Sequence, residues 1–229
     1  MNARTNPDLL ESGIYSLSDA AKLLNVPVNK VRVWVNGRGE RQAPLIQNQL
    51  GRAGHTYLIS FTNLMELRFI AKFAEAGVKL RVIRAGIAEA QDLLKRPHPL
   101  ATSTVFTTDG KHILARIMSD GGHEDVLDLK SQNYEMLTVI VDSLKPDVVF
   151  DAAGEATAWF PRRGIAPNVL IHPRFSFGRP ILLESQVPTA AIEQSVKVEG
   201  VEGTADLYEV PVEQVREAME FQAELRRAA

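Results

Sequence analysis

The residues best suited to chemistry lie in the stretch PVNKVRVWVN, residues 27–36. Asn29, Lys30 and Arg32 stand close together there. Arginine and lysine can pair with guanine edges or with phosphates, and asparagine can form two hydrogen bonds with adenine. Further side chains that could follow the flanking phosphates come next in the chain: Arg38, Arg41, Arg52 and His55. We therefore predict that these residues form a DNA-binding surface.

Catalytic chemistry has little support in the sequence. Cysteine is absent, which excludes disulfides, thiolate nucleophiles and cysteine-based zinc sites. His123, Glu124 and Asp125 form one tight group of possible metal ligands. Neighbouring residues of a strand point to opposite faces, however, so they are not expected to hold a metal together. Phosphate-binding and nucleophile motifs are missing as well. We predict no catalytic residue, no metal and no cofactor, and thus a protein that is not an enzyme.

Basic residues are concentrated around the candidate surface. Residues 22–84 hold eleven Lys or Arg against three acids, a net charge of +8, so the rest of the chain carries −10 of the total of −2. Such a division is typical of a part that faces nucleic acid joined to an acidic body. The alternative is a basic surface that is only solvated.

The elements that must position these residues are two short helices separated by a turn. Ser16 and Asp19 have the spacing of a capping box, which predicts a helix that begins near Leu17. Asn25 ends this helix, and Pro27 suits the first turn of the next one. The second helix has an apolar side on which Val28, Val31, Trp34 and Val35 lie. Asn29, Lys30 and Arg32 fall on the opposite side, which is the arrangement of a helix-turn-helix.

A loop, a strand and two more helices complete the first segment. The strand is expected over 56–60, and the helices over 62–76, before Gly77, and over 79–95, before Pro97. From Ile14 to Leu94 this series resembles the DNA-binding domain of MerR-type regulators. The resemblance implies that Asn29, Lys30 and Arg32 lie on the recognition helix, and that Arg52 and His55 lie in a wing. The wing is longer than in that family, and His55 stands where the family usually has Arg.

The middle segment, residues 103–163, changes to the period of strands. Asp109 and Gly110 mark the turn of one hairpin, EDVLDL is a further strand candidate, NYEMLTVIVDSL a helix, and DVVFDAAGEATAWF a second hairpin. A small α+β unit is the natural assembly. Trp159 is either an exposed aromatic anchor for a partner or part of the core.

The third segment, residues 165–229, begins with the proline- and glycine-rich stretch HPRFSFGRPILLESQVP. Helical patterns follow over 189–198, 203–208 and 211–227. Phe175 and Phe177 beside Gly178 could be core residues or could face a partner. This segment resembles a small helical domain of VapB-type antitoxins, in His172–Pro173, in Gly178 with Pro180 and Ile181, and in the helices after Val187–Pro188. It departs from that family at residues 184–186, where a Gly-Thr-Arg triplet is usual.

The whole order therefore predicts an α+β protein with three domains: a MerR-like winged helix-turn-helix over 13–96, a small α+β unit over 103–163, and a helical domain over 165–229. The resemblance implies a VapB-type antitoxin that pairs with a PIN-type ribonuclease and binds its own operator DNA as a homodimer. No run of about 18 apolar residues is present, so a cytoplasmic protein without a membrane span is expected. Two alternatives remain open: a one-component regulator whose middle unit senses a small molecule, and an adaptor whose helix-turn-helix only packs against protein.

Overall fold

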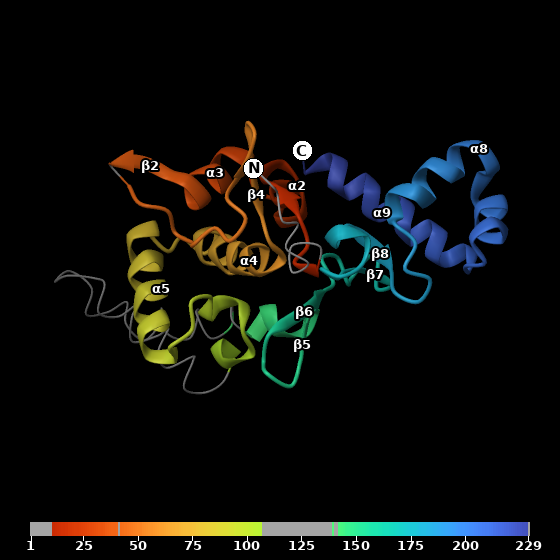
Figure 1. The fold of residues 1–229 in the computed structure, drawn as a ribbon. Helices are drawn as coiled ribbons and strands as arrows, with labels where there is room; N and C mark the ends of the chain where they lie inside the picture. Colours follow the sequence, from red (N-terminus) through yellow and green to blue (C-terminus); the bar gives the residue numbers. More distant parts are fainter. Residues whose placement is uncertain (1–10, 41, 107–138, 140–141, 229) are drawn as a thin grey trace, which may run out of the picture. The chain divides into compact units, whose positions relative to one another are not determined.

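The computed structural model describes residues 11–40, 42–106, 139 and 142–228 (Figure 1). It contains helices and two antiparallel sheets, which confirms the α+β class. Outside the described residues lie Arg41, the expected hairpin around Asp109–Gly110, the strand candidate over 124–129 and the group at 123–125. The chain forms two compact units. The first unit comprises Met1–Val28, Leu50–Phe61 and Thr157–Ala229, and the second comprises Asn29–Gln49 and Thr62–Ala156. Each unit is described by itself.

The first unit begins with β1 (Tyr15–Ser16) and α2 (Leu17–Leu24). The capping box is formed as predicted. The Ser16 hydroxyl oxygen accepts the Asp19 N–H at 3.1 Å, and the Asp19 carboxylate accepts the Ser16 N–H at 3.1 Å. Asn25 ends the helix in a left-handed conformation with φ 54°. These two caps explain why a helix of only eight residues is well defined here.

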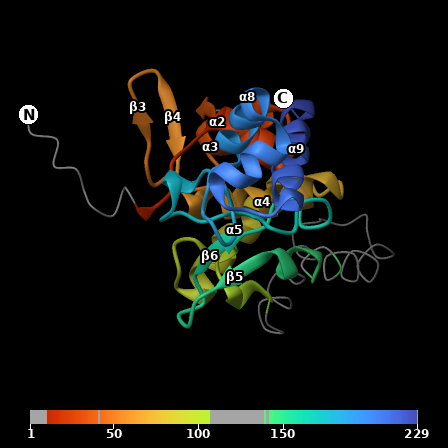
Figure 2. The same cartoon turned by 90° about the vertical axis from the view of Figure 1, so that its right-hand side faces the viewer.

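A three-stranded antiparallel sheet of order β1-β4-β3 completes the N-terminal part of this unit. β3 (Arg52–Ala53) and β4 (Thr56–Ile59) run side by side as a narrow arm (Figure 2). Tyr15 is opposite Ile59, and Arg52 is opposite Tyr57. The strand predicted over 56–60 is confirmed, whereas β1 and β3 were not predicted because two residues give no usable period.

The C-terminal part of the first unit contains three consecutive antiparallel strands and two long helices. β6 (Ala156–Trp159) pairs with β7 (Val169–Ile171), and β7 pairs with β8 (Pro180–Leu182). The helices are α8 (Thr189–Tyr208) and α9 (Val212–Arg227). α8 bends at Gly200, where φ is 74°, and the Thr204 hydroxyl then reaches the Ser195 hydroxyl at 3.0 Å. The bend separates the two helical patterns that the sequence predicts over 189–198 and 203–208.

Trp159 belongs to the core of the first unit, with only 3% of its surface exposed. Its neighbours Ala158 and Phe160 form a buried apolar cluster with Leu170 and Ile181. Because Trp159 is buried among apolar side chains, it is a core residue. The alternative that it is an exposed aromatic anchor for a partner is therefore wrong. Burial of a side chain of this size is a large contribution to the stability of so small a core.

The second unit is built around α4 (Phe61–Glu75) and α5 (Leu80–Leu94), which confirm the helices expected over 62–76 and 79–95. α4 is nearly enclosed, since Leu64, Leu67, Ile70 and Phe73 all have at most 1% of their surface exposed. α3 (Val28–Asn36), β2 (Gly37–Glu40) and β5 (Val148–Phe150) also belong here, with three single turns of 3-10 helix at Pro99–Ala101, Ser103–Phe106 and Lys145–Asp147. None of the described helices of either unit is long and apolar enough to cross a membrane.

Candidate nucleic-acid interface

The two sides of α3 differ as the sequence predicts. Val31, Trp34 and Val35 are buried, whereas Asn29, Lys30 and Arg32 are exposed. The separation follows from the helical period, which places residues three and four apart on one side. The helix carries two cations and no acid. It therefore presents a polar and cationic side to solvent while its other side is fixed in a core.

Two of the exposed side chains are held together. An Arg32 guanidinium nitrogen donates to the Asn29 side-chain oxygen at 3.1 Å, one turn away on the helix. A guanidinium has five N–H donors, and this contact uses one of them. The remaining donors can address a base edge or a phosphate while Asn29 restrains the long arginine side chain. Such restraint lowers the entropy that is lost on binding.

A tight turn after α3 displays the next cation. Gly37 has φ +70°, and a Cβ there would lie 2.2 Å from the Gln42 carbonyl oxygen, so only glycine fits. The Arg38 N–H donates to that same carbonyl at 2.8 Å, and the Leu45 N–H donates to the Trp34 carbonyl at 2.8 Å. The Arg38 side chain is exposed, whereas Arg41 lies outside the described residues. Arg38 is thus fixed directly after the end of α3.

A buried polar network holds the loop that follows. The Asn63 side chain accepts the Gln49 N–H at 3.0 Å and donates to the Gln47 carbonyl at 2.9 Å. Its amide also donates to the Glu66 carboxylate at 3.0 Å, and that carboxylate lies 3.1 Å from His98 Nδ1. The hydrogen bond to Glu66 raises the pKa of His98, while burial opposes the increase. The network ties the loop to α4, and neither Asn63 nor His98 was among the predicted site residues.

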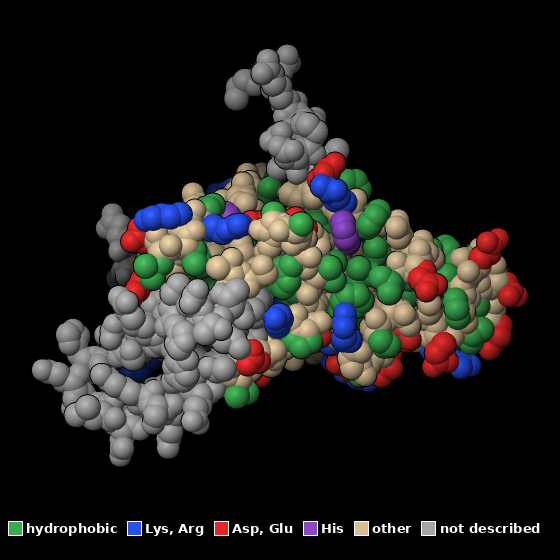
Figure 3. Space-filling model, turned by 90° about the horizontal axis from the view of Figure 1, so that it is seen from below, with side chains coloured by type: hydrophobic (Ala, Val, Ile, Leu, Met, Phe, Trp, Pro, Cys, Tyr) green, Lys and Arg blue, Asp and Glu red, His purple; other side chains and the backbone are tan. Residues whose placement is uncertain are grey.

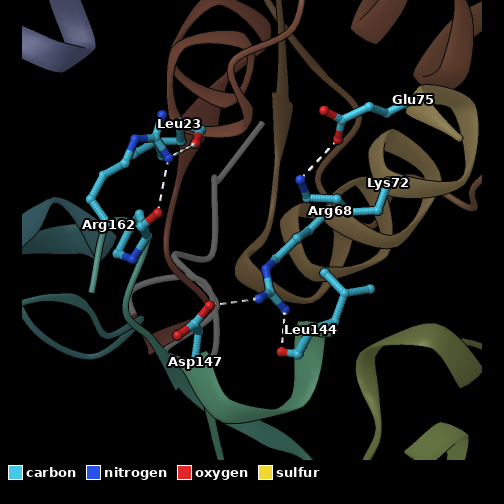
Figure 4. A network of polar contacts seen from close by, with 8 residues as sticks. Leu23, Arg68, Lys72, Glu75, Leu144, Asp147 and Arg162 are labelled. Carbon is cyan, nitrogen blue, oxygen red and sulfur yellow. Dashed lines mark hydrogen bonds and ion pairs between the residues drawn. The ribbon is translucent and has the colours of Figure 1, made fainter. Parts of the chain in front are cut away.

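Two arginines of the basic stretch make structural contacts, and one of them, Arg68, is buried. Arg68 has 7% of its surface exposed. It donates to the Leu144 carbonyl at 2.9 Å and pairs with Asp147 at 3.4 Å (Figure 4). Burial lowers its pKa to about 10, and the Asp147 charge opposes this change. Arg84 donates to the Ala43 carbonyl at 2.8 Å and so fixes the loop to α5. The net charge of residues 22–84 therefore overstates the charge presented to solvent.

Arg52 and His55 belong to the first unit, so they form a separate set from the α3 residues. Both are exposed. The Arg52 guanidinium carbon lies 5.8 Å from the centre of the Tyr57 ring, within the range of a cation–π contact. His55 lies in the two-residue turn between β3 and β4. A turn at the end of a narrow arm is a suitable position for a backbone contact.

Arg162 supports α2 from a position far along the chain. It donates to the Leu23 carbonyl at 3.1 Å (Figure 4). It also reaches the Lys22 carbonyl at 3.5 Å, and both carbonyls belong to the last turn of the helix. Burial lowers its pKa, which the charge of Glu224 opposes. Carbonyls at a helix end lack partners within the helix, so a cation there is favourable. Sequence reasoning missed this contact because nothing local marks a partner 139 residues away.

The two remaining partner candidates are on the surface. Phe175 is 37% exposed and Phe177 is 56% exposed, so neither is a core residue. A contact of these rings with a partner stays a prediction. No group of three possible metal ligands occurs among the residues that the structure describes.

Comparisons with known proteins show a sequence relative and a related fold. The chain is 26% identical over 226 aligned residues to a protein of Mycobacterium tuberculosis named "Putative antitoxin VapB45", with 90% of this chain and 92% of the relative covered. The crystal structure of Rv2018 from Mycobacterium tuberculosis has a similar fold. Its TM-score is 0.72 at 22% identity, and the match covers 90% of this chain and 96% of that one. No family model matches the chain.

Proposed function

We propose that this protein is a cytoplasmic antitoxin of a type II toxin–antitoxin system. It neutralises a PIN-type ribonuclease and represses its own operon by binding operator DNA as a homodimer. The similarity to a protein named as a VapB antitoxin supports the antitoxin part, because it extends over 90% of the chain. Such a protein acts by binding and needs no catalytic residue of its own.

The exposed side of α3 is the observation that supports DNA binding. Three residues that can address base edges and phosphates lie on a helix whose other side is buried. In this proposal residues 13–96 form a MerR-like helix-turn-helix, and α3 enters the major groove. Arg38, Arg52 and His55 contact the neighbouring backbone. Residues 103–163 and 165–229 form the two further domains. Most of the acidic residues belong to this part of the chain, which remains available to bind the toxin.

Binding to the DNA upstream of the protein's own gene tests the first half. In a fluorescence anisotropy titration, Arg32→Ala should raise the Kd about 5- to 150-fold, the value of one specific base contact. Lys145→Ala is the control, since Lys145 is an exposed cation of the 3-10 turn Lys145–Asp147 and not of α3, and its loss should leave the Kd unchanged. An unchanged Kd for Arg32→Ala removes α3 from the interface. If wild-type protein shows no salt-sensitive binding to this DNA, DNA recognition is wrong.

Co-expression with the product of the neighbouring gene tests the second half. Expression of a ribonuclease toxin alone should stop growth, and this protein should restore it through a complex that co-elutes in size-exclusion chromatography. Growth arrest that this protein does not relieve, or the absence of a complex, contradicts the antitoxin role. The two halves are separable, because Arg32→Ala should still restore growth.

A one-component regulator remains the second candidate. A hollow in the second unit is lined by eight residues: Met65, Arg68, Phe69, Leu100, Ala101, Val148, Phe150 and Ala156. Its accessible volume is about 10 Å³, far below the roughly 300 Å³ at which small-molecule pockets usually begin. The hollow does not favour a sensor. An increase in the thermal midpoint caused by a metabolite, in the absence of any protein partner, would favour the one-component regulator.

A further inference from the structure

The loop between β7 and β8, residues 172–179, has an unfavourable backbone that the first unit holds in place. Ser176, Phe177 and Gly178 are left-handed in succession, with φ of 48°, 56° and 83°. This region is unfavourable for residues with a Cβ. The Ile14 N–H donates to the Phe177 carbonyl at 3.0 Å. Gly178 packs so closely on Tyr15 that an added Cβ would lie 2.2 Å from the hydroxyl oxygen.

This loop, called the aromatic loop below, displays a group of side chains typical of protein interfaces. Phe177 is 56% and Phe175 is 37% exposed, and the Phe175 ring lies 4.6 Å from the His172 ring. Arg174 and Arg179 are exposed on the same loop. Arg174 pairs with Glu11 at 3.3 Å, but both side chains are largely exposed, so the pair is weakly held. Aromatic and arginine residues dominate interface energetics, and backbone strain is kept where an exposed group has a role.

A second surface of the same unit has the complementary character. Residues 198–213, called the acidic bend below, include the Gly200 corner of α8. Val198 is 81% exposed and Leu207 is 63% exposed. The segment has no basic residue and five acids: Glu199, Glu202, Asp206, Glu209 and Glu213. Figure 3 shows acidic side chains with hydrophobic ones between them at the end where α8 lies.

We propose that the aromatic loop of one copy binds the acidic bend of a second copy, and that the contact is reciprocal. Each surface supplies exposed apolar side chains, and the two carry opposite charges, so each can bury what the other leaves exposed. Both surfaces remain exposed within one copy, so they do not satisfy each other there. A second copy of the chain necessarily carries both an aromatic loop and an acidic bend. Two equal contacts make a closed two-fold dimer.

The dimer would extend the proposed function, because two copies of α3 could then address two half-sites of an operator. Only this link to the operator rests on the proposed function; the contact between two copies does not. The experiment needs neither DNA nor toxin, so the dimer and the DNA interaction can fail separately.

A charge exchange between two variants tests the contact. Variant one carries Arg174→Glu and Arg179→Glu, and variant two carries Glu199→Lys, Glu202→Lys, Asp206→Lys and Glu209→Lys, which leaves Glu213 as the one acid of its bend. Each variant alone opposes like charges at both contacts, so its dimer Kd in sedimentation velocity should rise at least about tenfold. In an equimolar mixture both contacts join opposite charges again. The mixture should therefore form a mixed dimer with nearly the wild-type Kd. Lys95→Glu with Lys145→Glu is the control for charge reversal elsewhere and should dimerise as wild type.

Phe177→Gly separates association from folding. Glycine accepts the left-handed backbone, so the thermal midpoint should not fall, whereas loss of the ring should weaken the dimer at least about tenfold. Unchanged dimerisation of Phe177→Gly, a mixture of the charge variants that stays monomeric, or a monomeric wild type overturns the proposal. Assemblies that grow beyond the dimer overturn its two-fold form. If wild type is monomeric and Phe177→Gly instead weakens the toxin complex, the loop binds the toxin and not a second copy.

Discussion

Individual residues of this protein owe their importance to what surrounds them, as two glycines of the first unit demonstrate. Gly178 and Gly200 both have a positive φ, of +83° and +74°, and Gly200 combines it with a ψ of 179°, which almost only glycine adopts. A Cβ at Gly178 would clash with the buried Tyr15 hydroxyl, whereas nothing lies within 4 Å of a Cβ at Gly200. The two positions therefore separate backbone strain from steric conflict.

We expect Gly178→Ala to lower the free energy of unfolding by roughly 2–5 kcal/mol, the sum of left-handed strain and overpacking. Gly200→Ala should cost about 1–3 kcal/mol, because backbone strain alone acts there. Urea unfolding followed by circular dichroism measures both. Equal losses would contradict the close packing of Gly178 on Tyr15.

His98 gives stability that depends on pH in a defined direction. Its hydrogen bond to Glu66 raises its pKa above the ordinary 6.5. The stabilisation is therefore complete below that ordinary value and is lost as the pH rises through the higher pKa of the folded state. His98→Gln should remove this decline, since glutamine can donate to Glu66 without titrating. Unfolding free energies measured between about pH 5.5 and 8.5 test this, and an equally steep decline in the variant would exclude His98 as its source.

At the scale of elements, α2 depends on contacts at both ends. Arg162 donates to carbonyls of its last turn, whereas the neighbouring Arg163 is exposed, with its guanidinium 4.1 Å from the Phe160 ring centre. Arg162→Met should lower the unfolding free energy by about 1–3 kcal/mol, because the carbonyl of the buried Leu23 loses this donor, whereas the Lys22 carbonyl keeps the Asn25 N–H. Arg163→Met is the matched control and should cost about 1 kcal/mol or less. A larger effect of Arg163→Met would mean that Arg162 is not what supports α2.

The helices around the candidate site could be predicted because their signals are local. Ser16, Asp19 and Asn25 act on the backbone next to them, and the apolar period of α3 spans nine residues. β7 and β8 were missed, since a strand of only three residues carries no period that distinguishes it from a loop. The exposed side of α3 was therefore predictable. The side chains that hold the neighbouring helix α2 and the loop after α3 were not. Asn63 and Arg162 act on segments distant in sequence, and only the folded chain brings them there.

For the whole molecule, the burial of Arg68 limits how strongly the proposed DNA binding can depend on salt. Of the eleven cations in residues 22–84, Arg68 is buried and engaged with Leu144 and Asp147. At most ten remain, so the log–log slope from this stretch should be no steeper than about −9 per protomer. Arg68→Met should lower stability without changing the slope, whereas Arg32→Ala should reduce the slope by about one. Kd values measured over a salt series decide this, and an equal effect of both changes would place Arg68 at the DNA.

The burial of Trp34 and Trp159 has a spectroscopic consequence. These are the two tryptophans of the chain, one in each compact unit, and both are almost fully enclosed. The variants Trp34→Phe and Trp159→Phe would each leave a single intrinsic fluorophore. A red shift of the emission would then report the opening of one unit at a time. Denaturant curves of the two variants would coincide if the units open cooperatively and would separate if α3 opens independently of the C-terminal strands and helices.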